Sequence, residues 1–292
     1  MKPFDLAIVL FVVTIWGLNF VFVKIGVAEI PPFLFMALRF GVVALILVPF
    51  IKWPHGRGKA LIAYSMMLGV IHFGLMFNAI HLIDASTVAL LSQLNTPFAV
   101  ILSAVLFRDY PGWKRVLGIA IAFGGCFVIA GEPRFDGALL PILMVVGGTF
   151  AWAVAAVQAK QLGSIGPFAL NGWMALFATP PLLLISLATE TGQWDAMRMI
   201  SVNAVISVLY QSVLVVIVGY GLWYGLIKRY PLSRVIPFTL LLPVVGVAGG
   251  VLALGEAMTM EMVIGGGLII VGVGIVALRQ AARGEIAPVR PH

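Results

Sequence analysis

The first apolar segment of the chain, residues 5–25, reads DLAIVLFVVTIWGLNFVFVKI. It carries one acidic residue at its start, Asp5, and one basic residue near its end, Lys24. A helix of about 20 apolar residues is long enough to cross the hydrocarbon core of a bilayer. The segment therefore predicts a transmembrane helix. We expect it to be retained, because its apolar region is too long for a signal peptide and no cleavage site follows it.

Segments of the same kind recur along the whole chain. The ten segments cover residues 5–25, 33–51, 60–82, 86–107, 115–131, 138–159, 168–189, 203–227, 233–254 and 262–279. They do not alternate polar and apolar residues, as the strands of a membrane β-barrel would. The sequence therefore predicts an all-α integral membrane protein with ten transmembrane helices and no room for a soluble domain.

The composition excludes a soluble protein. Only 10% of the 292 residues are charged, 62% are hydrophobic, and the mean hydropathy is +1.11. Soluble globular proteins carry about 25% charged residues. The formal net charge of +7 is best explained by basic cytoplasmic loops, so we expect no nucleic-acid partner. The single cysteine, Cys126, excludes an intramolecular disulfide, and the sequence predicts neither a metal site nor a cofactor.

The distribution of basic residues predicts the orientation in the membrane. Most of the 18 Lys and Arg residues fall on the side of the predicted bundle that holds both termini. Lys24, Arg134 and Arg198 fall on the other side, and Arg39 lies inside the second span. Because Lys and Arg accumulate in cytoplasmic loops, we expect both termini in the cytoplasm, with a tail over residues 280–292.

The two halves of the sequence resemble each other, which indicates an internal repeat. The matching positions are Trp16 with Trp152, Lys24 with Lys160, Pro97 with Pro243, and residues 118–125 with residues 265–272. We therefore predict two five-helix repeats, over residues 5–131 and 138–279. An odd number of helices per repeat inverts the second repeat relative to the first, around a central cavity, as in transporters that bind substrate near the membrane midplane.

The ends of the predicted spans carry motifs of a known family. In the first half, residues 78–91 read NAIHLIDASTVALL and residues 94–97 read LNTP. In the second half, residues 224–233 read YGLIKRYPLS, residues 242–243 read LP and residues 254–256 read LGE. These stretches resemble the EamA repeat of the drug/metabolite transporter superfamily, over about residues 5 to 279. The sequence departs from the family pattern at Arg108-Asp109, where Gly-Glu is usual.

Within that superfamily the chain most resembles bacterial exporters of aromatic and other neutral amino acids. The resemblance implies a multi-pass carrier of the bacterial inner membrane that moves amino acids out of the cytoplasm by alternating access. It also implies that lipid and a small-molecule substrate are its partners and that a monomer can act alone. A drug or other small metabolite is the alternative substrate.

Polar side chains at depth in a membrane are costly, so their presence suggests a substrate site. Amide and imidazole groups can bind an ammonium or a carboxylate, and aromatic rings offer cation–π contacts. The candidates for the cavity are Trp16, Asn19, Asn78, His81, Gln93, Asn95, Trp152, Gln158, Gln211, Tyr220 and Tyr224. Each polar residue has an alternative role in hydrogen bonding between helices, and we assign His72 a structural role of this kind.

Two prolines, Pro97 and Pro243, remove backbone donors inside predicted helices, so we expect hinges there. No span has a carboxylate near its centre, which argues against a site for cations. If transport is coupled to protons, His72 and His81 are the candidates, and facilitated diffusion down the substrate gradient is the alternative. Of the other protein classes, a membrane enzyme would need a catalytic motif, and a channel would need a selectivity filter. The sequence shows neither.

Overall fold

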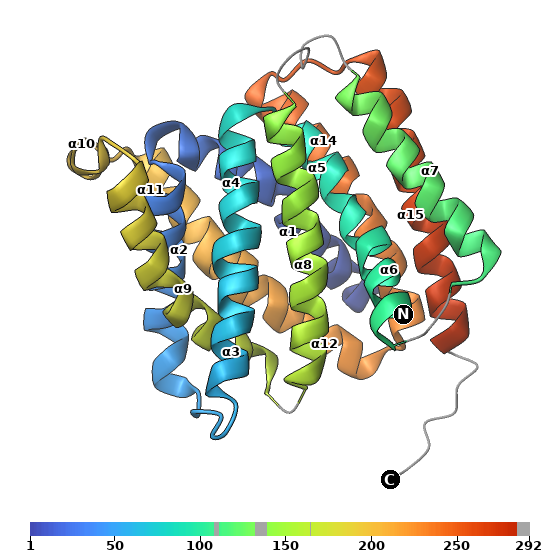
Figure 1. The fold of residues 1–292 in the computed structure, drawn as a ribbon, viewed down its shortest axis with the longest axis horizontal. Coiled ribbons are helices and arrows are strands. Elements are labelled where there is room, and N and C mark those ends of the chain that lie inside the picture. Colours follow the sequence, from blue (N-terminus) through green and yellow to red (C-terminus); the bar gives the residue numbers. More distant parts are fainter. Residues whose placement is uncertain (108–110, 132–138, 164, 285–292) are drawn as a thin grey trace.

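The structure is a computed structural model of the chain, and it describes all residues except 108–110, 132–138, 164 and 285–292. The described part is helical throughout, with no strand, and contains ten helices long and apolar enough to cross a membrane (Figure 1). The ten spans are Pro3–Glu29, Pro32–Phe50, Gly58–Leu82, Ala85–Leu106, Trp113–Ala130, Leu140–Gln161, Pro167–Thr189, Val202–Arg229, Pro237–Leu254 and Met260–Leu278. The predicted fold class and number of spans are confirmed.

Half of the spans are formed by uninterrupted helices. These are α1 (Pro3–Glu29), α7 (Trp113–Ala130), α8 (Leu140–Gln161), α9 (Pro167–Thr189) and α15 (Met260–Gly284). Several of these helices begin with proline in their first turn, where its missing N–H costs no hydrogen bond. The last helix extends to Gly284, so the predicted tail at 280–292 begins as helix. The rest of that tail, with Arg108, Asp109 and Arg134, lies outside the described residues.

The other spans are built from several helical segments. The second span joins α2 (Pro32–Leu47) to the 3₁₀ turn η1 (Val48–Phe50), and the third joins α3 (Gly58–Tyr64), η2 (Ser65–His72) and α4 (Phe73–Leu82). The fourth joins α5 (Ala85–Leu91), η3 (Ser92–Leu94) and α6 (Asn95–Phe107). The eighth joins α11 (Val202–Leu209), η5 (Tyr210–Gly219) and α12 (Tyr220–Arg229), and the ninth joins η6 (Ile236–Leu241) to α14 (Leu242–Leu254). Two short helices, α10 (Gln193–Arg198) and α13 (Leu232–Val235), lie in the connections.

The irregular segments occur at equivalent places in the two halves of the chain. The third and eighth spans contain the π-helical segments η2 and η5. The fourth and ninth spans contain the 3₁₀ segments η3 and η6, each followed at once by the helix that holds Pro97 or Pro243. Such interruptions are common at functional sites and hinges in helices. Pro97 and Pro243 therefore lie in the first turn of a helix, where they do not disrupt its hydrogen bonds. The change from 3₁₀ to α-helix comes just before each proline.

Helices α7 and α15 pack side by side at one edge of the bundle (Figure 1). A Cβ atom on Gly118 would lie 2.8 Å from the carbonyl oxygen of Gly272, and one on Gly265 would lie 2.7 Å from that of Gly125. Only glycine allows backbones to approach this closely. The contact is reciprocal, because Gly118 faces Gly272 while Gly125 faces Gly265, and these glycines are the ones that match between the two halves. An inverted repeat predicts this reciprocal arrangement.

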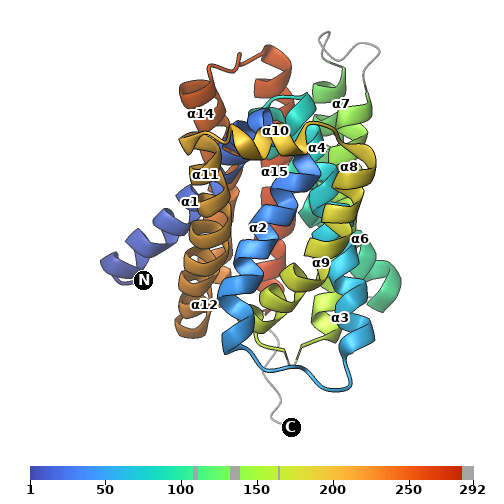
Figure 2. The same ribbon diagram turned by 90° about the vertical axis from the view of Figure 1, so that its left-hand side faces the viewer.

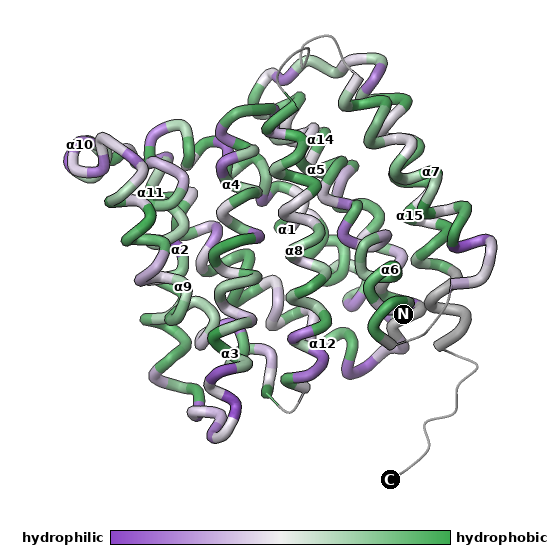
Figure 3. Tube along the Cα trace, viewed as in Figure 1, coloured by the Kyte–Doolittle hydropathy of each residue, from purple (hydrophilic) through white to green (hydrophobic). Residues whose placement is uncertain are grey.

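Hydrophobic residues dominate the middle of the helices, while hydrophilic residues gather at the two ends of the bundle (Figure 3). Helix α10 lies crosswise at one end (Figure 2). Its Trp194 is exposed, with the guanidinium carbon of Arg198 4.9 Å from the indole centroid. A tryptophan beside a basic residue at this level is typical of the membrane interface. Following the orientation predicted from the basic residues, we call the end of the bundle where α1 begins and α12 ends the inner end, and the opposite one the outer end.

Candidate functional site

A cavity of about 490 Å³ lies among the spans, within the range of small-molecule sites. Trp16 from the middle of α1, His72 from the middle of the third span and Trp152 from the middle of α8 all contribute to its wall. The wall is completed by Asn19, Phe20, Arg39, Phe73, Met76, Phe77, Ile80, Ser92, Gln93, Asn95, Thr96, Val215, Tyr220, Trp223, Thr239 and Leu242. The cavity is therefore central and draws on both halves of the chain.

Aromatic rings form one wall of the cavity. The ring centroid of Trp16 lies 5.2 Å from that of Tyr220 and 5.3 Å from that of Trp223, both tilted by 52°. Tyr224 does not line the cavity but stacks behind Tyr220, with centroids 6.0 Å apart. Tilted and offset ring pairs at these separations are stable arrangements. This wall can accept an apolar or aromatic group and holds its own rings in place.

The π-helical segment η5 positions α1 against this wall. The indole Nε1 of Trp16 donates a hydrogen bond to the carbonyl oxygen of Val215 at 3.2 Å. The Tyr210 hydroxyl donates to the carbonyl oxygen of Ile15 at 2.8 Å. A Cβ on Gly219 would lie 2.6 Å from Trp16 Nε1, so the indole depends on glycine there. The π-helical pattern also shifts backbone carbonyls out of their usual pairing, which makes them available to neighbouring side chains.

The cavity wall also carries a buried arginine, Arg39. Arg39 is 3% exposed, and its guanidinium carbon lies 4.6 Å from the ring centroid of Phe73, 5.2 Å from that of Phe40 and 5.5 Å from that of Phe77. Cation–π contacts at these distances stabilise the charge. Its Nε and Nη1 atoms are buried without a hydrogen-bond partner among the described residues.

The third span is held to α8 beside the cavity by His72. Its Nδ1 donates a hydrogen bond to the carbonyl oxygen of Gly148 at 2.8 Å, and the residue is 6% exposed. The structural role predicted for His72 fits this bond, although the residue also lines the cavity.

Six of the eleven predicted cavity residues line this cavity. They are Trp16, Asn19, Gln93, Asn95, Trp152 and Tyr220. The polar wall residues outside the predicted set are Arg39, His72, Ser92, Thr96 and Thr239, and the aromatic ones are Phe20, Phe73, Phe77 and Trp223. Among these residues, Arg39 was the one that the sequence could have identified as a site residue, because an arginine inside a membrane span is costly and usually functional.

The other five predicted residues do not line the cavity. Tyr224 lies behind Tyr220. The Asn78 side chain donates to the carbonyl oxygen of Gly74 on its own helix, at 2.8 Å. His81 is exposed at the outer end, and Gln211 is fully buried, where its Nε2 donates to the carbonyl oxygen of Asn19 at 3.1 Å. Gln158 is half-buried on α8 but does not reach the cavity wall.

Hydrogen bonds link α1 and α4 at the outer end of the bundle. The ammonium of Lys24 donates to the carbonyl oxygens of Ile80 at 2.8 Å and Ile83 at 3.0 Å. His81 Nδ1 donates to the carbonyl oxygen of Val27 at 2.9 Å. These bonds satisfy carbonyl groups at helix C-termini, where cations are favoured.

Two glutamates cap helix N-termini at the same outer end. The carboxylate of Glu256 accepts hydrogen bonds from the backbone N–H groups of Ala85 at 2.7 Å and Ser86 at 2.9 Å, at the start of α5. Glu190 does the same for Phe33 at 2.7 Å and Leu34 at 3.1 Å, at the start of α2. Carboxylates satisfy free N–H groups and the positive end of the helix dipole.

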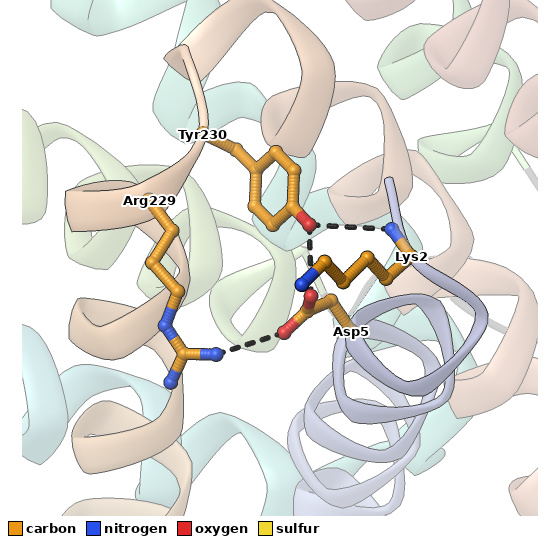
Figure 4. A network of polar contacts seen from close by, with 4 residues as sticks. All are labelled: Lys2, Asp5, Arg229 and Tyr230. Carbon is orange, nitrogen blue, oxygen red and sulfur yellow. Dashed lines mark hydrogen bonds and ion pairs between the residues drawn. The ribbon is translucent and has the colours of Figure 1, made fainter.

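The inner end has its own link, between α1 and the end of α12 (Figure 4). Asp5 is 4% exposed, and its carboxylate accepts hydrogen bonds from Arg229 Nη1 at 2.9 Å and from the Tyr230 hydroxyl at 2.8 Å. The backbone N–H of Lys2 donates to the same hydroxyl at 3.2 Å. Residues from distant parts of the chain thus join the inner ends of the first and eighth spans.

Two stretches, residues 4–131 and 139–278, each match the EamA-like transporter family. The chain belongs to this family. The two matched stretches cover five spans each, and both contribute to the cavity wall. A solved crystal structure aligns with the EamA chain at a TM-score of 0.61, over 97% of this chain and 98% of the other, with 18% sequence identity. This structural similarity shows that the two chains share the same fold.

Relatives of this EamA protein include two bacterial proteins described as a "Probable amino-acid metabolite efflux pump". The one from Salmonella typhimurium is 33% identical over 91% of this chain and 92% of its own length. The one from Escherichia coli is 31% identical over 93% of this chain and 94% of its own length. An "Uncharacterized transporter" from Archaeoglobus fulgidus is 30% identical over 92% of this chain and 96% of its own length. The chain is a multi-pass transporter of the bacterial inner membrane, of the exporter type.

Proposed function

We propose that this protein exports neutral amino acids, aromatic ones among them, from the cytoplasm. The observation that carries the proposal is the central cavity, whose volume of about 490 Å³ suits one amino acid and whose walls combine aromatic rings with polar groups. The names of the relatives from Salmonella typhimurium and Escherichia coli support the same class of substrate.

We further propose that transport occurs by alternating access between the inner and outer ends of the cavity. The separate links at the two ends support this mechanism, since Asp5 joins spans at the inner end and Lys24 at the outer end. Breaking one set of bonds while keeping the other would expose the cavity to one side of the membrane at a time. The 3₁₀ segments before Pro97 and Pro243 are the proposed hinges.

A drug or other small metabolite is the alternative substrate, and the aromatic wall favours it for planar molecules. A cationic drug fits less well, because no carboxylate is among the described residues that line the cavity, and Arg39 repels a cation. The two substrate classes therefore differ in charge, which an experiment can test.

The experiment is counterflow in proteoliposomes with a panel of labelled amino acids, with and without a pH gradient. Saturable exchange of Phe, Met or Thr is expected. The variant Trp16→Ala should lose most of this exchange, while the control Trp194→Ala, on the exposed helix α10, should keep it. A folded preparation that exchanges no amino acid would refute the proposal, and the drug and metabolite panel would then be tested. Dependence on the pH gradient distinguishes antiport from facilitated diffusion.

A further inference from the structure

The unpaired guanidinium of Arg39 requires a partner that the described cavity wall does not supply. A charged group inside a membrane span is costly unless it is paired. The rings of Phe40, Phe73 and Phe77 stabilise the cation, but they leave Nε and Nη1 without hydrogen bonds. No described residue lining the cavity is acidic, so the cavity wall supplies no fixed counter-ion for this guanidinium.

The same cavity holds unpaired acceptors on other helices. Asn19 Oδ1 on α1 and Asn95 Oδ1 on α6 are both buried without a hydrogen-bond partner. Both residues line the cavity with Arg39. Each amide group carries one acceptor oxygen and two N–H donors. Rotation about the Cβ–Cγ bond can turn the oxygen towards a donor in the cavity. Two neutral acceptors suit an ammonium group.

One irregular segment positions both Arg39 and Asn19. The Ser212 hydroxyl in η5 donates a hydrogen bond to the backbone carbonyl oxygen of Arg39 at 3.1 Å. The neighbouring Gln211 donates to the backbone carbonyl oxygen of Asn19 at 3.1 Å. Two consecutive buried residues of η5 therefore tie α1 and α2, the helices that carry Asn19 and Arg39, to the same segment.

We infer that Arg39 binds the carboxylate of the substrate, while the amide oxygens of Asn19 and Asn95 accept hydrogen bonds from its ammonium. This inference rests on the proposed export of amino acids and specifies how the cavity recognises them. The guanidinium has a planar set of N–H donors that matches a carboxylate. The aromatic wall of Trp16, Tyr220 and Trp223 then receives the side chain. Recognition is thus of the zwitterion, with little discrimination among apolar side chains.

The inference predicts which analogues the cavity rejects. An amine without a carboxylate leaves the buried guanidinium unpaired and adds a second positive charge beside it. A carboxylic acid without an ammonium leaves the two amide oxygens unpaired, which costs less because they are neutral. Polar sites discriminate strongly against analogues that lack the group they are built to bind.

The wild-type protein provides the first test, which needs no variant to fold. Counterflow of labelled Phe in proteoliposomes is measured against unlabelled Phe, phenethylamine, phenylalaninamide and 3-phenylpropionate. We expect phenethylamine and phenylalaninamide to compete at least about 30-fold more weakly than Phe, and 3-phenylpropionate about 10-fold more weakly. Equal competition by the two amines would overturn the role of Arg39. Equal competition by 3-phenylpropionate would overturn the role of the amides. Absence of any amino-acid exchange would instead refute the proposed function.

Variants of Arg39 give the second test. Arg39→Gln removes the charge and should raise the half-saturating Phe concentration about 30-fold or more, while Arg39→Lys keeps the charge and should recover part of the loss. The matched control Arg198→Gln lies on α10, is exposed and should behave as wild type. Monodispersity and melting temperature in detergent show whether each variant folds.

The competition profile separates binding from a purely structural role of Arg39. If Arg39→Gln loses its preference for Phe over phenethylamine, the guanidinium recognises the carboxylate. If the variant folds and keeps both the preference and the half-saturating concentration, Arg39 does not bind substrate. A variant that fails to fold leaves the decision to the analogue series on the wild type.

Discussion

Replacement of Lys24 by methionine gives a quantitative prediction about access to the cavity from the outer end. Methionine keeps much of the length and apolar character of the side chain but removes the ammonium. The hydrogen bonds to the carbonyl oxygens of Ile80 and Ile83 are lost, while a third contact, to the carbonyl oxygen of His81, is long at 3.4 Å. The outer end should therefore open more often.

The size of the effect follows from the geometry of these bonds. Hydrogen bonds to a charged group contribute about 1.5–3 kcal/mol each when they are well shielded. Lys24 is half-buried, so water replaces part of each bond when the end opens, and the two good bonds together contribute about 1–2 kcal/mol to closure. That free energy corresponds to a shift of about 5- to 30-fold in the ratio of open to closed states.

A cysteine-labelling assay measures this shift. Cys126 is buried and is the single cysteine, so Cys126→Ser gives a cysteine-free background. Ser92→Cys then places a reporter of similar size on the cavity wall. The rate of labelling by a membrane-impermeant maleimide from the outer side should rise about 5- to 30-fold in Lys24→Met.

The control for this assay is Lys59→Met, because Lys59 is exposed at the inner end. Its labelling rate should equal that of the background. An unchanged rate in a folded Lys24→Met protein would show that the bonds of Lys24 do not hold the outer end closed. A faster rate in both variants would show a general loosening instead.

Three further changes test the packing and the other links. Gly125→Ala places a Cβ against the backbone of α15 and should lower the melting temperature by several degrees, whereas Gly124→Ala has open space and should not. Asp5→Asn weakens the bond to Arg229 and should reduce outer labelling of the cavity reporter, opposite to Lys24→Met; equal or faster labelling would contradict the inner link. Glu256→Gln removes the charge that caps α5 and should destabilise the protein by about 1 kcal/mol in thermal or denaturant unfolding.

Span positions were predictable from the sequence because hydropathy is a local property. The segment predicted at 60–82 is observed at Gly58–Leu82, and that at 203–227 is observed at Val202–Arg229. Each of the glycines that match between the halves lies against the counterpart of the other, Gly118 against Gly272 and Gly125 against Gly265. A run of about 20 apolar residues has no stable place except the membrane, whatever its neighbours are.

The composition of the site was only partly predictable, because it depends on which face of each helix meets the cavity. Asn19 and Asn78 look alike in the sequence, yet the first lines the cavity and the second bonds to its own helix. Gln211 was expected in the cavity, but the π-helical turn places it against the backbone of Asn19. No local sequence pattern predicts such a π-helical turn, because the packing of neighbouring helices stabilises it.

By itself the sequence determined the ten membrane spans, because the length and apolar character of each segment suffice for that. The internal repeat was predicted from residues that match between the two halves. Only the tertiary structure decided that Arg39, a single charge in the second span, faces the same cavity as Asn19 and Asn95. The physical reason is that the cost of burying a charge is visible in the sequence, while the identity of its partner depends on distances between helices far apart in the chain.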